Sequence, residues 1–277
     1  MEDLQGLLAR HGFNFKKQFG QNFISDGNLL RAIVDLSGID KDTTVVEIGC
    51  GAGTLTRVLS ERAKRVVAYE IDRALKPVLA ESLRGCENTE VRFADFSKVN
   101  LHALEKEIGE YVVVANLPYY ITTPLITRFL DEGQKVRRLV VMVQEEVADR
   151  LCATADTPEY GAITAALALR ASAKVVKRVS KTMFHPRPQV DSAVVRIDFE
   201  DGRLPVKDVA TYRLTVRAAF LNRRKTLENN LMRSFNVSRE TAQEILASAG
   251  VPDKARGETL SPERLAALSD IIFARLH

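Results

Sequence analysis

Short apolar runs alternate with amphipathic stretches over the first two thirds of the chain. The runs are four to six residues long and rich in valine, which favours buried β-strands, whereas the stretches between them repeat apolar residues at helical spacing. We predict strands at 43–48, 65–69, 90–93, 111–115 and 139–143, and helices at 28–37, 54–62 and 75–83. Strands that alternate with helices indicate βαβ units, and hence a mostly parallel sheet with both faces covered.

The pattern changes twice in the last third of the chain. Segments 174–179 and 193–199 are predicted to be strands joined by a proline-rich loop. They are too close for a helical crossover, so we expect an antiparallel pair. Beyond them only helical patterns remain, including a clear start at Ser261, which is followed by proline and glutamate. We therefore predict an α/β domain at 1–201 and a small all-helical domain at 202–277.

The composition is that of a globular protein with a sizeable core. The chain has 277 residues, of which 45% are hydrophobic and 27% charged, and this excludes disordered, collagen-like and coiled-coil chains. The longest uncharged run, 111–127, is too short and too interrupted by proline to span a bilayer. No signal-peptide pattern opens the chain, and three scattered cysteines support neither a disulfide framework nor a zinc site. We expect a cytoplasmic protein without a bound metal.

Positive charge is concentrated in two stretches rather than spread evenly. The net charge is only +4, but 171–190 holds five cations and no acid. Stretch 203–239 holds nine cations and two acids, and its densest point is the run Arg223-Arg224-Lys225. Either cluster alone is equally typical of a solvated helix face. Together they favour a polyanionic partner whose phosphates they would neutralise.

A glycine-rich loop follows the first predicted strand. Gly49, Gly51 and Gly53 stand at alternate positions, where the absence of Cβ lets the backbone turn tightly and approach a ligand closely. The dinucleotide fingerprint requires a further glycine at position 54, which is threonine here, and the lysine of a phosphate-binding P-loop is also absent. The loop by itself leaves a plain turn as an alternative.

Polar residues stand at the ends of the later strands. Glu70, Asp95 and Asn116 follow the second, third and fourth predicted strands, whose carboxyl ends meet in one crevice of an open α/β sheet. The Glu70 carboxylate is suited to accept hydrogen bonds from both hydroxyls of a ribose. The Asp95 carboxylate is suited to accept one from the exocyclic amine of an adenine. Each acid alone would more often be a surface carboxylate. Their combination with the glycine loop predicts a nucleoside with a small attached group, such as S-adenosylmethionine.

The tetrapeptide Asn116-Leu117-Pro118-Tyr119 suggests the chemistry. The Asn116 side-chain oxygen and the Leu117 carbonyl can accept hydrogen bonds from the two N–H groups of an adenine amine. With both N–H groups held in this way, the lone pair of the amine nitrogen points at a methyl donor. Tyr119 offers a face on which the base can stack. Phe184, in a second proline-rich loop, is suited to cover the other face of a flipped base, although a core phenylalanine that anchors the loop is an equal alternative.

These motifs together resemble the small-subunit ribosomal RNA adenine dimethyltransferases, the family whose loss gives kasugamycin resistance. The resemblance covers nearly the whole chain. The matching parts are 17–23, 47–53, Glu70, Asp95, 116–119, 184–192 and 220–227. The glycine loop is shared by most methyltransferases of this fold, and the motifs at 116–119 and 184–192 narrow the choice to adenine-N6 RNA methyltransferases. The Arg-Arg-Lys-Thr-Leu stretch is the feature most similar to this one family.

The resemblance implies a Rossmann-like class I methyltransferase fold with a seven-stranded sheet and a helical RNA-binding domain. It also implies the cofactor-binding residues, namely Asn22, the main chain of Ile24, Gly49, Glu70, Asp95 and Asn116. Gly49 would lie against the methionine part, Glu70 against the ribose and Asp95 against the adenine. The implied catalytic residues are Asn116, Leu117, Tyr119 and Phe184. The implied reaction is dimethylation of two adjacent adenines near the 3′ end of 16S rRNA, by a monomer acting on a partly assembled 30S subunit.

Two positions depart from the family pattern, and other functions remain open. Ile24 stands where leucine is usual, and Gln189 where lysine is common, which removes one phosphate contact. One alternative is the related macrolide-resistance methyltransferase of the large subunit. Another is an assembly factor in which RNA binding matters more than catalysis. A nicotinamide-dependent dehydrogenase is disfavoured by the spacing of the glycine loop.

Overall fold

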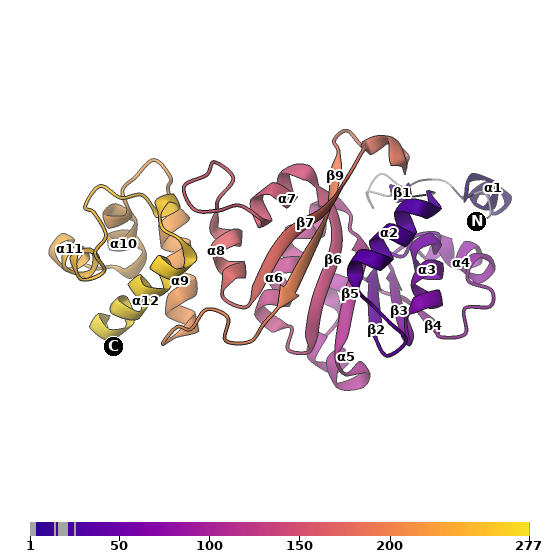
Figure 1. Ribbon diagram of the computed structural model, residues 1–277, viewed down its shortest axis with the longest axis horizontal. Coiled ribbons are helices and arrows are strands. Elements are labelled where there is room, and N and C mark those ends of the chain that lie inside the picture. Colours follow the sequence, from indigo (N-terminus) through magenta and orange to yellow (C-terminus); the bar gives the residue numbers. More distant parts are fainter. Residues whose placement is uncertain (1–3, 14, 16–21, 25, 277) are drawn as a thin grey trace. The chain divides into compact units, whose positions relative to one another are not determined.

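The computed structural model describes residues 4–13, 15, 22–24 and 26–276, which form two compact units (Figure 1). The first unit holds residues 1–148 and 173–199, and the second holds 149–172 and 200–277. The predicted division after residue 201 lies two residues beyond the boundary between 199 and 200, but segment 149–172 belongs with the helical unit. Helix α8 (Ala162–Ala168) accounts for this difference, because the Ala165 carbonyl accepts a hydrogen bond of 2.8 Å from the buried Tyr212 hydroxyl of that unit.

A seven-stranded sheet forms the centre of the first unit, and its strand order is β4-β3-β2-β5-β6-β9-β7. Neighbours from β4 to β6 are parallel, and β9 runs antiparallel to β6. The strands are β2 (Thr44–Ile48), β3 (Arg65–Glu70), β4 (Thr89–Phe93), β5 (Tyr111–Asn116), β6 (Val136–Gln144), β7 (Ala171–Val179) and β9 (Ser192–Phe199). The mostly parallel sheet of the sequence prediction is confirmed.

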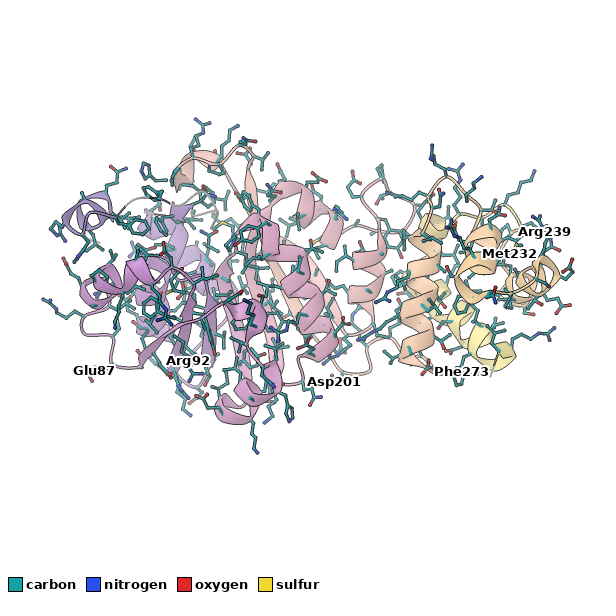
Figure 2. All side chains as sticks on the ribbon, turned by 180° about the vertical axis from the view of Figure 1, so that it is seen from behind. Glu87, Arg92, Asp201, Met232, Arg239 and Phe273 are labelled. Atoms are coloured by element: carbon teal, nitrogen blue, oxygen red, sulfur yellow. The ribbon has the colours of Figure 1, made fainter. Side chains whose placement is uncertain are left out.

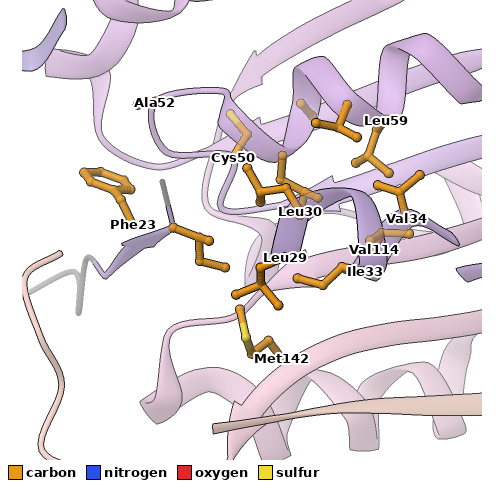
Figure 3. Packing of buried hydrophobic residues seen from close by; sticks show 14 of the residues in the cluster. Phe23, Leu29, Leu30, Ile33, Val34, Cys50, Ala52, Leu59, Val114 and Met142 are labelled. Atoms are coloured by element: carbon orange, nitrogen blue, oxygen red, sulfur yellow. The ribbon is translucent and has the colours of Figure 1, made fainter. Parts of the chain in front are cut away.

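Helices cover both faces of this sheet because successive strand residues point to opposite sides. The elements are α1 (Leu4–Arg10), α2 (Gly27–Ser37), α3 (Thr54–Arg62), α4 (Lys76–Ser82), α5 (Leu101–Ile108), α6 (Thr122–Glu132) and α7 (Glu145–Leu151). Helix α2 is capped by Asp26, whose carboxylate accepts the Leu29 N–H at 2.8 Å, and by Gly38 with φ +64°. Its buried residues Leu29, Ile33 and Val34 belong to one core with Val114 of β5 and Met142 of β6 (Figure 3).

The opposite face of the sheet is covered by aromatic side chains. Tyr69 of β3 makes an edge-on contact with Phe96 at 4.9 Å between ring centroids, and Phe96 packs on Phe129 of α6 at 5.9 Å. Val66 and Ala68, which alternate with Tyr69 along the strand, belong to the core on the α2 side. The alternation fixes which residues of β3 face each layer.

A second, very short sheet joins two segments that are far apart in the sequence. Strand β1 (Phe23–Ile24) pairs antiparallel with β8 (Phe184–His185), so the N-terminal segment lies against the proline-rich loop. Most of the sequence motif at 17–23 lies outside the described residues. Periodicity does not predict such a pair, because two residues are too few to show an alternation.

The second unit is helical, as predicted. Its main helices are α8, α9 (Val209–Phe220), α10 (Leu227–Phe235), α11 (Arg239–Ser248) and α12 (Pro262–Leu276). Figure 2 labels Met232, Arg239 and Phe273 on three of them. The backbones approach closely at Gly257, where a Cβ would lie 2.0 Å from the Ala219 carbonyl oxygen, so only glycine fits. No helix among the described residues combines the length and the apolar character needed to cross a bilayer.

Candidate active site

The carboxyl ends of β2 to β5 surround a cavity that brings most of the predicted site residues together. In an open parallel sheet these strand ends meet along one edge, which is where ligands bind. Of the predicted residues, the cavity is lined by Asn22, Gly49, Glu70, Asp95, Asn116, Leu117 and Tyr119. These residues are spread over nearly 100 positions of the sequence, from 22 to 119, and come from four strand ends and the N-terminal segment.

The glycine loop forms one wall of this cavity. The Gly49 and Cys50 N–H groups both donate to the Tyr69 carbonyl, at 2.8 and 3.0 Å, which ties the loop to β3. Gly51 has φ +57°, and a Cβ there would lie 2.4 Å from the Phe23 ring. Glycine at this position is therefore required both by the backbone and by the ring that packs on it.

Glu70 is held in a fixed orientation at the end of β3. Its Oε2 accepts the Gly51 N–H at 2.8 Å and its Oε1 accepts the Asp72 N–H at 2.7 Å. Burial raises the pKa of this carboxyl, and the two N–H donors oppose that shift. Because each carboxylate oxygen has a second lone pair, both remain able to accept a ligand hydroxyl.

Asp95 divides its two oxygens between the fold and the cavity. Its Oδ1 accepts hydrogen bonds from the hydroxyl and the N–H of Ser97, at 2.7 and 3.0 Å. The Ser97 hydroxyl is the main reason that the pKa of Asp95 is lowered, so the carboxyl is ionised at neutral pH. The Oδ2 atom lies 3.8 Å from Lys98 Nζ, which is too long for a hydrogen bond and leaves it as an acceptor.

Arg128 of α6 holds the turn that follows Asp95. Its Nη1 donates to the carbonyls of Phe96 and Ser97, at 3.0 and 2.9 Å, and its Nη2 donates to the Val99 carbonyl. This one guanidinium therefore links the short 3₁₀ helix η3 (Phe96–Lys98) to the helix behind the Asn116 loop. Arg128 could not be found from the sequence, because its partners are backbone carbonyls some 30 residues away and no motif marks them.

Asn116 is oriented by the N-terminal segment. Its Nδ2 donates a hydrogen bond of 2.8 Å to the Asn22 carbonyl, so the atom left to accept a hydrogen bond is its Oδ1. The following residues turn through Pro118 into the 3₁₀ helix η4 (Tyr119–Ile121). There the half-buried Tyr119 is fixed by a hydrogen bond of 2.8 Å between its hydroxyl and that of Ser192.

Comparison with known proteins identifies the family. A family model described as "Ribosomal RNA adenine dimethylase" matches residues 12–272 of this chain. The chain belongs to the ribosomal RNA adenine dimethylase family. It is 45% identical over 275 residues to ribosomal RNA small subunit methyltransferase A of Geobacillus thermodenitrificans, covering 96% of this chain and 94% of the relative. The corresponding protein of Clostridium acetobutylicum is 41% identical, with 96% and 97% covered.

Solved structures agree with this assignment. A dimethyladenosine transferase from Plasmodium falciparum, 24% identical, has the same fold with a TM-score of 0.77, covering 89% of this chain and 95% of that one. The 23S rRNA methyltransferase ErmE is 28% identical with a TM-score of 0.72, covering 91% and 100%. Membership in the dimethylase family makes this chain an rRNA adenine methyltransferase and excludes the nicotinamide-dependent dehydrogenase.

Two of the predicted site residues lie away from the cavity wall of this dimethylase. Phe184 is only 5% exposed and pairs with Ile24 in the small sheet. Ile24 is also buried, and its carbonyl accepts a hydrogen bond of 3.1 Å from the Thr54 hydroxyl. This placement favours the alternative in which Phe184 anchors its loop, and it makes Ile24 a support for Asn22 and Phe23. Contact of Phe184 with a flipped base stays a prediction.

The aromatic and charged groups behind the cavity were also missed by the sequence analysis. Tyr69 and Phe96 line the cavity between Glu70 and Asp95. The Tyr69 hydroxyl accepts a hydrogen bond of 3.3 Å from Arg92 on the edge strand β4, labelled in Figure 2. Arg92 is in turn paired with Glu90 and Glu107. The alternation of charged and apolar residues in β4 predicts which of them share a face of the sheet. It does not show that the charged face contacts the Tyr69 ring.

Proposed function

We propose that this chain transfers methyl groups from S-adenosylmethionine to the N6 amines of two adjacent adenines near the 3′ end of 16S rRNA. We place this reaction in the cytoplasm, with a monomer acting on a partly assembled small subunit and its helical unit contacting the RNA. Membership in the dimethylase family and the small-subunit names of the relatives support this proposal. The observation that carries it is that Glu70, Asp95 and Asn116 line a single cavity.

The cavity wall has the polar groups that a nucleoside cofactor needs. Glu70 has a free lone pair on each oxygen for the ribose hydroxyls, and Asp95 Oδ2 is an acceptor for the adenine amine. A Cβ on Gly49 would meet nothing closer than 3.8 Å, so the glycine leaves room beside the Asn116 loop for the methionine part. When bound, the cofactor would supply an electrophilic methyl group on a positively charged sulfur.

The residues of the Asn116 loop would prepare the target amine. The lone pair of an adenine amine is delocalised into the ring, which makes the nitrogen a poor nucleophile. Acceptance of one N–H by Asn116 Oδ1 and of the other by the Leu117 carbonyl would favour a pyramidal nitrogen whose lone pair points at the methyl group. Tyr119 would hold the base by stacking. No strong base is needed, because the methylated amine is acidic enough to lose its proton.

The decisive experiment is methyl transfer by an Asn116→Ala variant. Purified enzyme is incubated with tritiated cofactor and undermethylated small subunits, and mass analysis of the 16S rRNA locates the modified adenines. We expect Asn116→Ala to abolish transfer while its melting temperature stays near that of the wild type. Asn28→Ala, which removes an exposed asparagine of α2, is the matched control and should retain activity. Full activity of Asn116→Ala would remove the proposed mechanism.

The choice of ribosomal subunit is tested separately. Naked large-subunit rRNA replaces the small subunits in the same assay, because the macrolide-resistance enzymes act on the large subunit. We expect methylation of small subunits only. Methylation of large-subunit rRNA instead would assign this chain to the alternative function, and binding of small subunits without transfer would favour the assembly factor.

A further inference from the structure

Two successive aromatic residues at the cavity are held in different ways. Tyr119 is half-buried and fixed by Ser192, as described above. Tyr120 also lines the cavity, but 59% of its surface is exposed. A side chain that lines a cavity and still exposes more than half of its surface lies at the cavity mouth. A ring at a cavity mouth is positioned to contact a molecule that enters the cavity.

The local backbone separates the directions of the two rings. Both residues belong to the 3₁₀ helix η4, in which three residues complete a turn. Successive side chains are therefore rotated by about 120° about the helix axis, so the two rings cannot present their faces to the same base. Tyr119 is the ring directed at the base beside Asn116, and Tyr120 is available to a different group at the mouth.

The charge of the cavity indicates what this group is. Among the described residues, the cavity lining includes two carboxylates, Glu70 and Asp95, and no lysine or arginine. A phosphate at the mouth would be repelled by these carboxylates, and the Lys98 ammonium group, whose Nζ lies 3.8 Å from Asp95 Oδ2, offsets only one of the two charges. A neutral, flat nucleobase suits an exposed phenol ring, since stacking on an aromatic side chain requires no particular sequence.

We propose that Tyr120 is a stacking platform for the nucleotide adjacent to the adenine being methylated. This inference rests on the proposed function, in which the two target adenines are neighbours in the RNA strand. Because the two rings diverge, they can hold two different bases of the strand, one at the reacting position and one outside. Tyr120 is a specificity-determining residue for the RNA and makes no essential contact with the cofactor.

The test compares Tyr120→Ala with Tyr120→Phe, which keeps the ring and loses only the hydroxyl. Val209→Ala, which shortens an exposed apolar side chain of α9, is the control for a general surface effect. We expect Tyr120→Ala to raise the KM for undermethylated small subunits about tenfold, within the range that loss of one stacked base produces. The kcat should change less than the KM, and Tyr120→Phe and Val209→Ala should behave like the wild type.

Two binding measurements complete the test. Calorimetry with S-adenosylmethionine alone should give the same affinity for Tyr120→Ala and the wild type, and sedimentation should show weaker binding of the variant to small subunits. The proposal is overturned if Tyr120→Ala weakens cofactor binding in the absence of RNA, since the ring would then cover the cofactor. It is also overturned if the KM and affinity for small subunits stay within twofold of the wild type. Failure of the proposed function is distinct, because the wild type would then transfer no methyl group.

Discussion

Several polar side chains of the cavity use one atom to hold the fold and keep another for a ligand. Asn116 donates through Nδ2 to Asn22 and keeps Oδ1, and Asp95 binds Ser97 through Oδ1 and keeps Oδ2. Because each bond to the protein fixes the orientation of its group, the acceptor that remains is aimed before any ligand arrives. Such preorganisation lowers the cost of reorganisation during the reaction.

Glu47 differs, since it is buried beside the glycine loop and does not line the cavity. It is 1% exposed, and its Oε2 has no hydrogen-bond partner among the described residues. Burial raises the pKa of this carboxyl from 4.5 to about 8, so the folded chain keeps a proton that the unfolded chain loses. The folded state then binds more protons than the unfolded state between these pH values, and its stability falls as the pH rises.

We predict that Glu47→Gln removes this dependence. The glutamine has nearly the same shape but cannot ionise, so the variant should gain stability relative to the wild type as the pH rises from 5 to 8. The gain should reach at most about 1.4 kcal/mol per pH unit. Urea unfolding at pH 5, 6.5 and 8 measures it, with exposed Glu87→Gln as control. The prediction would be contradicted if the free energies of unfolding of Glu47→Gln and the wild type differed by the same amount at all three pH values.

At the scale of elements, the site depends on how turns are tied to the helices behind them. Arg128 joins the turn after β4 to helix α6, which directly follows the Asn116 loop. A guanidinium suits this task because its donors form a planar fork that reaches several carbonyls at once. The turn that carries Asp95 and the helix that follows the Asn116 loop are thereby connected through one side chain.

We predict that Arg128→Lys weakens cofactor binding about five- to tenfold. Lysine keeps the charge but concentrates its donors at one point, so it cannot bind the carbonyls of Phe96, Ser97 and Val99 together. The turn that carries Asp95 then loses its fixed position. Calorimetry with S-adenosylmethionine measures the change. Arg137→Lys, which alters an exposed ion pair with Glu110 on the same sheet, is the control and should bind normally. Wild-type affinity in Arg128→Lys would refute this role.

The sequence predicts the long elements well and the connections between them poorly. Valine-rich strands such as β3 and β5 are found within a residue of their predicted ends, because burial on both faces produces continuous apolar runs. The pairing of β1 with β8 and the bonds of Arg128 leave no periodic signal. Glu70, Asp95 and Asn116 could be predicted to share one site, because a parallel sheet brings the carboxyl ends of its strands together. The burial of Phe184 was one of two equal alternatives, since its motif does not show which neighbours surround it.

At the scale of the whole molecule, the three cations of the run 223–225 differ in how far the fold already uses their side chains. Arg223 donates to the carbonyls of Pro158 and Tyr160, at 3.2 and 3.0 Å, and so serves the helical unit itself. Arg224 and Lys225 are exposed, and their side chains make no hydrogen bond or ion pair within the described part of the chain. Arg224 and Lys225 are therefore the two cations of this run that make no other side-chain hydrogen bond or ion pair among the described residues, whereas Arg223 is held in place but keeps its charge.

We predict that the double variant Arg224→Ser, Lys225→Ser binds small subunits more weakly and with less dependence on salt. Loss of two phosphate contacts should reduce the slope of log affinity against log salt concentration by about 1.5. Binding titrations between 50 and 300 mM salt measure this slope. Lys41→Ser, Lys106→Ser removes two exposed cations of the first unit and is the matched control. An unchanged slope in the first variant would show that this run does not contact RNA.

The hydrogen bond between Asn116 and Asn22 has a consequence for the second round of methylation. In the proposed mechanism an unmodified adenine brings two protons to the two acceptors of the loop, but a monomethylated one brings a single proton. A flipped Asn116 carboxamide would place its oxygen against the Asn22 carbonyl, so the hydrogen bond to Asn22 disfavours the exchange of acceptor for donor. By this mechanism one acceptor loses its partner on the amine, and the site is matched better to its first substrate than to its own intermediate.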